Sequence, residues 1–286
     1  MRTIVLSDID HDDSGIIPYS LRLVQDLESD VRVIHVVDTR DKQGIYSAYS
    51  ASQNVTPEVE SYEDILLKER KKAEDYLSKH ISRTVSEINL TSKVDQEVLV
   101  GQIDTIVPAE TKKPDNSLLM ISARPQGKVW STSDDIFYIV AHTSDPVLLI
   151  PPNREYKKPE KALFISNLEE KEPDHLKDAL DLMKPLNMQL EALTTSGNAG
   201  FESKMKEDED WKGLLDSIKK FHSIDDDDAG KIKALAEEQN AGVIIVFEKK
   251  RNIIKRMISK SMTEKLAAIT SMPLLVYYRK IKKKNR

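Results

Sequence analysis

The sequence predicts an α/β protein built from two similar halves. Short, continuous apolar runs alternate with stretches in which apolar residues recur at helical spacing, a pattern typical of parallel strands that helices bury on both faces. The same order of runs occurs twice in the 286 residues, a length that fits two domains of about 100–200 residues each. Each half opens with an apolar run, Ile4–Leu6 or Ala162–Ile165, and closes with a strand that begins at Pro146 or Pro273. We therefore expect two tandem sandwiches.

The first half contains four apolar runs of strand length. Leucines and a valine at helical spacing predict a helix over 21–27, and a second helix is expected over 134–143. Residues 39–58 are polar and predict a long loop, which a long charged helix over 60–89 follows. Because that helix is longer than a compact sandwich needs, we expect part of it to project or to cover a cleft. The expected strands are Ile4–Leu6, Val31–Val37, Leu118–Ile121 and Pro146–Ile150.

The second half repeats this order. Its expected strands are Ala162–Ile165, Met188–Leu193, Val243–Phe247 and Pro273–Tyr278, and its expected helices cover 176–183, 229–240 and 251–269. The acidic run Asp225–Asp228 directly precedes the second of these helices, where carboxylates complement the helix dipole, so we interpret it as a cap and not as a calcium loop.

A stretch with three prolines and five charges, Pro151–Glu160, separates the halves and is typical of a linker. We predict a first domain over 1–151, a linker over 152–160, a second domain over 161–279 and a basic tail over 280–286. For the tail, a solvated terminus is the simplest interpretation, and weak binding to phosphates or acidic partners is the alternative.

Composition excludes several classes of protein. The chain has no cysteine, which rules out disulfide scaffolds, thiolate metal sites and cysteine nucleophiles, and is typical of a cytoplasmic protein. The 43 basic and 48 acidic residues give a net charge of −5, so we expect no nucleic-acid partner. No apolar run approaches the roughly 20 residues that cross a bilayer, so we expect no membrane partner.

Both halves end in the same way. A helix that begins near a serine leads into a proline and an apolar strand, in Ser133–Ile150 and again in Lys260–Val276. Together with His35–Asp38 and Val98–Gly101, these segments resemble the strand ends and closing motifs of universal stress protein domains, and the whole chain resembles a tandem member of that family. The resemblance implies a five-stranded parallel sheet flanked by helices in each half. It also implies pairing of the last strands, which makes the chain a pseudo-dimer; a homodimer of the chain is a further alternative.

Members of this family that bind ATP carry Gly-x2-Gly-x9-Gly-[Ser/Thr] after the fourth strand, where bare backbone and a helix N-terminus hold the phosphates. In the second half the three glycine positions are Phe247, Lys250 and Lys260, and Ser261 takes the hydroxyl position. In the first half only Gly127 offers bare backbone, and Pro125 lacks an N–H donor. Both loops predict degenerate sites. The sequence establishes no cofactor with certainty; ATP or another adenine nucleotide stays an open alternative that these loops do not favour.

The resemblance nevertheless defines candidate nucleotide-binding positions at the strand ends. The family's first-strand aspartate falls on Ile9, so that Asp8 or Asp10 serves only with a shift of one residue. Lysines around 249–260 present either an anion site or the solvated face of a helix. The candidate residues are Asp8, Asp10, Val37, Ser122, Gly127, Ser133, Asn167, Lys250, Lys260 and Ser261.

The acids after the first strand have a second interpretation. Asp8, Asp10 and Asp12 resemble the carboxylates of magnesium-dependent phosphoryl-transfer enzymes, whose oxygen ligands hold a hard cation. Against this, Asp12 stands where the phosphatase pattern requires threonine or valine, and Asp13 or Ser14 makes a suitable helix cap. The histidines form no metal-binding spacing, and His35, within a strand, is interpreted as structural.

From these observations we expect a cytoplasmic, non-catalytic binding or regulatory protein of the tandem universal stress protein type, with an unknown small-molecule ligand. The alternative is a divalent-metal-dependent phosphohydrolase that uses the Asp8-Asp10-Asp12 cluster.

Overall fold

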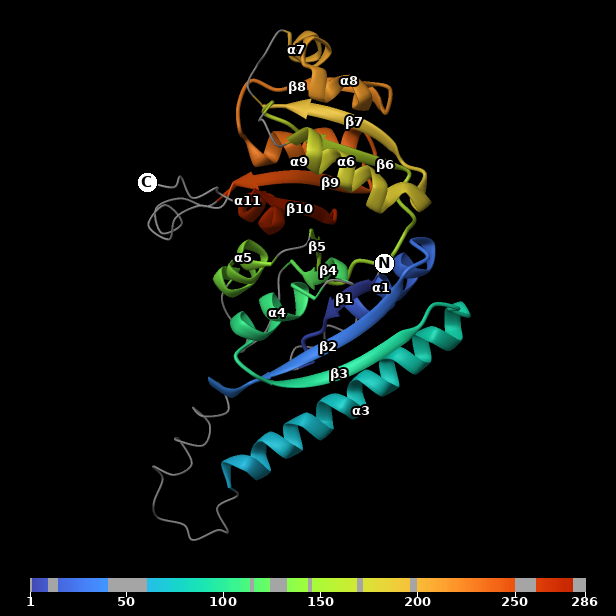
Figure 1. Ribbon diagram of the computed structural model, residues 1–286, viewed down its shortest axis with the longest axis vertical. Coiled ribbons are helices and arrows are strands. Elements are labelled where there is room, and N and C mark those ends of the chain that lie inside the picture. Colours follow the sequence, from blue (N-terminus) through green and yellow to red (C-terminus); the bar gives the residue numbers. More distant parts are fainter. Residues whose placement is uncertain are drawn as a thin grey trace. The chain divides into compact units, whose positions relative to one another are not determined.

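The computed structural model describes residues 2–9, 15–40, 61–113, 116–123, 133–143, 146–168, 172–195, 200–249 and 261–279. It confirms the α/β class (Figure 1). The strands are β1 (Arg2–Leu6), β2 (Asp30–Asp38), β3 (Val94–Gly101), β4 (Asn116–Ser122), β5 (Val147–Ile150), β6 (Lys161–Ile165), β7 (Gln189–Thr194), β8 (Ile218–Ser223), β9 (Val243–Lys249) and β10 (Leu274–Arg279). The helices are α1 (Ile16–Asp26), α3 (Tyr62–Ile88), α4 (Ile103–Thr111), α5 (Ser133–His142), α6 (Glu172–Met183), α7 (Phe201–Glu207), α8 (Glu209–Leu215), α9 (Ala229–Glu238) and α11 (Met262–Ile269).

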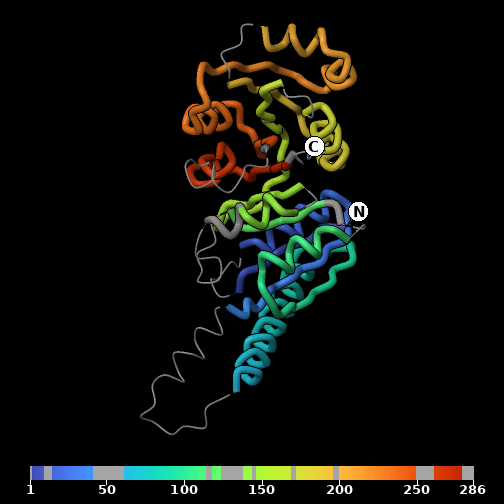
Figure 2. Tube along the Cα trace, turned by 60° about the vertical axis from the view of Figure 1, so that its left-hand side comes forward, coloured from blue at the N-terminus to red at the C-terminus, as the bar shows by residue number. Residues whose placement is uncertain are grey.

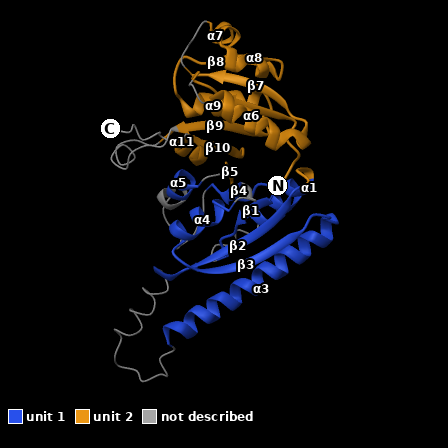
Figure 3. Ribbon diagram, in the orientation of Figure 1, with its two compact units in different colours: residues 1–25, 29–145, 152–155 blue, residues 26–28, 146–151, 156–286 orange. Residues whose placement is uncertain are grey.

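The chain divides into two compact units (Figure 3). Unit 1 takes residues 1–25, 29–145 and 152–155, and unit 2 takes residues 26–28, 146–151 and 156–286. Strand β5 belongs to unit 2 because it pairs antiparallel with β10, with Leu148 opposite Leu275. The last strands of the two sequence repeats therefore pair with each other, as the resemblance implied. The domain boundaries given above stay a prediction.

Both units use the same strand order. In unit 1 the order is β3-β2-β1-β4, and every pair is parallel. In unit 2 the parallel order is β8-β7-β6-β9-β10. The order reverses beside the first strand of each repeat, between β1 and β4 and between β6 and β9. Open parallel sheets bind ligands at this switch point, outside the carboxyl ends of the strands.

The core explains why the strand sequences are continuously apolar. Ile4, Val5 and Leu6 of β1 and Phe164 of β6 are fully buried, because helices cover both faces of each sheet. Figure 2 shows this layering in unit 2, with α6 on one side of the strands and α9 and α11 on the other. Among the described helices, none has the length and apolar character needed to cross a bilayer.

Helix α3 is longer than its contact with the sheet. Ser61 begins it with a capping box that includes Asp64, and Asn89 ends it in the left-handed conformation. Its buried residues, from Ala73 to Thr84, lie in the part that packs on β2 and β3. Leu67, nearer the start, is 67% exposed. The first turns of the helix therefore gain little from burial.

Two features of the second repeat differ from the sequence-based expectation. The helix expected over 251–269 does not run through position 261: Ser261 is an extended N-cap, and α11 begins at Met262 because Ser261 and Glu264 form a capping box. Strand β8 and helices α7 and α8 were not predicted. Strand β8 is an edge strand that includes the exposed Lys219 and Lys220, so it lacks the apolar run of a central strand.

The two units carry buried ion pairs of reversed polarity at equivalent positions. Arg32 of β2 lies opposite Ile4 of β1, is 8% exposed, and forms ion pairs with Glu97 and Glu110. Glu191 of β7 occupies the matching place in unit 2, opposite Leu163 of β6.

The Glu191 carboxylate lies 2.7 Å from His222 Nε2 and 3.5 Å from Lys161 Nζ. Burial raises its pKa, but contacts with His222 and Lys161 outweigh burial and leave the pKa below its ordinary value. Both repeats therefore bury a charged side chain at this position and provide it with oppositely charged partners, but the sign of the buried charge differs between them.

Replacing Arg32 with Gln should lower the free energy of unfolding by about 2–3 kcal/mol, because it removes the buried cation from Glu97 and Glu110 and leaves Glu110 with the exposed Lys113 alone. Urea unfolding at neutral pH measures this change. The control is Arg70→Gln on the exposed face of α3, where Arg70 pairs with Glu74; that substitution should cost about 0.5 kcal/mol or less. Equal effects of the two substitutions would contradict a stabilising role for the buried pair.

Candidate functional site

The candidate site in each unit is the carboxyl edge of the parallel sheet, that is, the side at which its strands end. Strand ends and helix N-termini meet there, and the unpaired main-chain N–H groups of a helix N-terminus can hold an anion. The chemistry of this edge therefore depends on which groups already accept hydrogen bonds from those N–H groups.

In unit 1, Asp38 at the end of β2 fills such a position. It is 1% exposed, and its carboxylate accepts hydrogen bonds from the Ile103 main-chain N–H at the start of α4 (3.1 Å) and from the Arg40 side chain (2.6 Å). Burial raises the pKa of Asp38, but the hydrogen bonds from Arg40 and Ile103 outweigh burial and leave the pKa below its ordinary value. Asp38 thus joins β2 to α4 as an anion at neutral pH.

The other described positions at this edge are buried. Asp8, directly after β1, is 1% exposed, Ser122 at the end of β4 is 3% exposed, and Val37 of β2 is 3% exposed. His35 Nδ1 lies 2.8 Å from the Ser7 carbonyl oxygen, which fits its predicted structural role. In this structure these side chains are part of the protein interior.

In unit 2, Glu172 at the start of α6 fills the turn after β6. It is 4% exposed; its carboxylate accepts hydrogen bonds from the Ser166 hydroxyl and from the Asn167 main-chain N–H (3.2 Å). The Ser166 hydroxyl oxygen in turn accepts the Leu168 N–H at 3.1 Å. The N–H groups of Asn167 and Leu168, at the start of the turn, therefore have protein acceptors.

Side chains from three loops meet beside this turn. Asn167 follows β6, Thr195 follows β7, and Asp227 precedes α9. The Thr195 hydroxyl is within hydrogen-bond distance of the Asn167 amide oxygen, at 3.2 Å, and of the Asp227 carboxylate. Asp228, the next residue, accepts the Lys231 N–H at 2.9 Å, which confirms that the acidic run caps α9.

At the end of β9, Glu248 fills the N-terminus of α11. It is 7% exposed, and its carboxylate accepts both the Thr263 main-chain N–H, at 3.0 Å, and the Thr263 hydroxyl, at 2.9 Å. Ser261, 4% exposed, accepts the Glu264 N–H at 3.1 Å, and the Glu264 carboxylate accepts the Ser261 N–H at 3.1 Å. The N–H groups of Ser261, Thr263 and Glu264 at the start of α11 therefore already have protein acceptors.

Several candidate residues lie outside the described part of the chain: Asp10, Gly127, Lys250 and Lys260. Ser133 is the first residue of α5. For the metal hypothesis, Asp8 is described whereas Asp10 and Asp12 are not, and the described residues contain no group of three or more histidines and carboxylates that could hold a metal ion. The nucleotide-binding and metal-binding assignments stay predictions.

The sequence analysis did not single out the three carboxylates that close this edge, those of Asp38, Glu172 and Glu248. The signal for Asp38 and Glu248 is an acid at the carboxyl end of an apolar strand, followed by a loop and then by the start of a helix. Glu172 carries a weaker signal, an acid at the first position of a helix.

Replacing Asp38 with Asn should lower the free energy of unfolding at pH 7 by about 1–3 kcal/mol, since the amide accepts weaker hydrogen bonds from Arg40 and Ile103. The folded pKa of Asp38 is depressed, so its stabilisation is present above about pH 4, the ordinary aspartate value, and declines as pH falls through the folded pKa. Urea unfolding of both proteins between pH 7 and pH 3 should show the difference shrinking at the acid end. A difference that grows on acidification would contradict the assignment.

Comparisons with known proteins come from solved structures. No protein-family profile and no curated protein matches the chain. A universal stress protein from Archaeoglobus fulgidus DSM 4304 matches with a TM-score of 0.68 and 13% identity, covering 97% of this chain and 96% of its own. A functionally unknown protein from Pseudomonas aeruginosa PAO1 matches with a TM-score of 0.59 and 10% identity, covering 97% and 92%.

The cytoplasmic domain of a prokaryotic cation chloride cotransporter also matches, with a TM-score of 0.51 and 10% identity over 96% of this chain and 94% of that one. At such identities the likeness concerns the fold alone. Across nearly its full length, the chain has the fold of a universal stress protein structure, and this confirms the fold that the resemblance implied.

Proposed function

We propose that this chain is a non-catalytic binding or regulatory protein of the tandem universal stress protein type, acting in the cytoplasm in response to stress, and that the nucleotide site of its second repeat is degenerate. The fold supports the first part of the proposal, because it is similar to that of a universal stress protein and to that of the cytoplasmic domain of a transporter. Fold does not determine function, so the site must carry the second part.

One observation carries the degenerate-site proposal: the Glu248 carboxylate is bonded to the first turn of α11. In the ATP mode implied by the resemblance, phosphate oxygens would accept hydrogen bonds from this helix N-terminus. A phosphate would therefore compete with a buried acceptor that is covalently tethered to β9. It would also bring negative charge against a carboxylate, which is costly at a buried site.

The loops support the same conclusion from sequence. Phe247, Lys250 and Lys260 replace the three glycines of the family's motif in the second repeat, and Pro125 removes an N–H donor in the first. The unknown ligand of this protein is therefore proposed to be something other than a triphosphate held by main-chain N–H groups.

Calorimetric titration with ATP, ADP and AMP, each with magnesium, should give no saturable heat for the native chain. Replacing Glu248 with Ala should release the α11 N–H groups and produce measurable ATP binding. The control Glu202→Ala makes the same charge change on the exposed face of α7 and should bind no better than the native chain. Micromolar ATP affinity in the native protein would overturn the degenerate-site proposal.

The phosphohydrolase alternative has its own test. It requires magnesium-dependent release of phosphate from p-nitrophenyl phosphate, and Asp8→Asn should abolish that activity. We expect no magnesium-dependent hydrolysis by the native chain. Magnesium-dependent turnover that disappears in the Asp8→Asn variant would replace the binding-protein proposal with the enzymatic one.

A further inference from the structure

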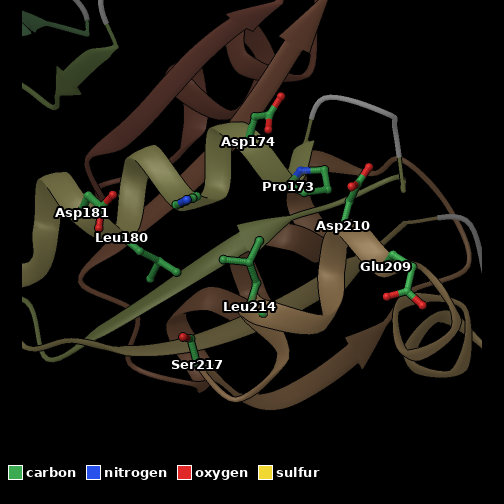
Figure 4. Close-up of a pocket in the computed structure, with 10 residues that line it drawn as sticks. Pro173, Asp174, Leu180, Asp181, Glu209, Asp210, Leu214 and Ser217 are labelled. Atoms are coloured by element: carbon green, nitrogen blue, oxygen red, sulfur yellow. The ribbon is translucent and has the colours of Figure 1, made fainter.

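Unit 2 contains an open groove between α6 and α8. Its volume is about 590 Å³, within the usual range of about 300–1,000 Å³ for small-molecule sites. Figure 4 shows Leu180 of α6 and Leu214 of α8 pointing toward one another across the groove. Asp181 lies toward one end and Asp210 toward the other. The groove thus combines an apolar middle with polar ends.

A glycine keeps the groove open. Gly213 lines it from α8, and a Cβ atom built at this position would meet nothing within 4 Å. Neither close packing nor a left-handed conformation therefore requires glycine there. Glycine within a helix costs roughly 0.5–1 kcal/mol relative to alanine. The fold would be more stable with a side chain at 213, whereas an occupant of the groove needs the space.

The charges around the groove define its occupant. The lining residues include four acids, Asp174, Asp181, Glu209 and Asp210, and one base, Lys177, which leaves a net charge of −3. Glu209 pairs with Lys212. Asp181 and Asp210, on opposite walls, form no ion pair within the described part of the chain and are available to a ligand.

The geometry points to a binding site for a linear aliphatic polyamine. Its ammonium groups would lie against Asp181 and Asp210, and the methylene chain between them would cover Leu180 and Leu214. The amines would donate charge-assisted hydrogen bonds to the carboxylates, and the chain would bury apolar surface. A polyamine of the spermidine type matches the polar-apolar-polar order of the lining, with one ammonium for each of the two acids, Asp181 and Asp210.

Lys177 gives the site a distinguishing property. Its ammonium is the one positive charge among the lining residues and repels a polyamine, so its removal should strengthen binding. If the groove bound the polyamine through apolar contacts alone, removal of Lys177 would not strengthen binding. The polyamine site shares no residue with the candidate nucleotide-binding positions, and its two proposed ligands, Asp181 and Asp210, lie within helices α6 and α8.

Calorimetric titration of the full chain with spermidine at physiological salt should show one saturable site. Asp181→Asn and Asp210→Asn should each weaken binding about tenfold, the loss of one charged hydrogen bond. Lys177→Gln should tighten binding several-fold. Glu238→Gln, an exposed acid on α9 outside the groove, is the charge-matched control and should bind like the native chain.

The Gly213→Leu variant distinguishes an effect on the groove from an effect on folding. The added side chain fills the groove, so spermidine binding should disappear while the thermal unfolding temperature stays the same or rises. Native-like spermidine binding by Gly213→Leu, or by both aspartate variants, would overturn the proposal. So would displacement of spermidine by equimolar magnesium, or binding of a lysine-rich peptide to the groove when spermidine does not bind.

Discussion

Buried carboxylates that accept main-chain N–H groups hold together the carboxyl edges of both parallel sheets. Asp38 binds the start of α4, Glu172 binds the turn after β6, and Glu248 binds the start of α11. Each is buried, with at most 7% of its surface exposed, so water does not reach the N–H groups that these carboxylates bind. The same constraint determines what the edge can bind, because an external anion must displace an internal one that is already in position.

The two repeats preserve architecture more closely than chemistry. Strand order and pairing recur, whereas the buried polar group under the helices is an arginine in one unit, Arg32, and a glutamate in the other, Glu191. Each retains oppositely charged neighbours, because an unsatisfied buried charge is too costly to keep. The side chains at the strand ends also differ between the repeats, and they are therefore better guides to ligand chemistry than the shared fold.

Sequence patterns predicted the central strands well, since β1, β2, β6 and β9 are buried on both faces and are therefore mostly apolar, with Arg32 and His35 as polar exceptions in β2. They missed β8, whose alternation is blurred by exposed lysines at a sheet edge, and the start of α11, because a local capping box at Ser261 outweighs an apolar stripe that continues upstream. The sequence could place the candidate site at the strand ends, but it could not show that buried carboxylates already occupy the helix N-termini there. Glu248 meets Thr263 only in three dimensions, across 15 positions of sequence.

A crystal structure of the full chain grown with millimolar magnesium and ATP tests the central claim most directly. The account predicts that the Glu248 carboxylate stays on the N–H and hydroxyl of Thr263, with no phosphate density at the start of α11. Phosphates seated on those donors, with the Glu248 side chain turned away, would contradict it.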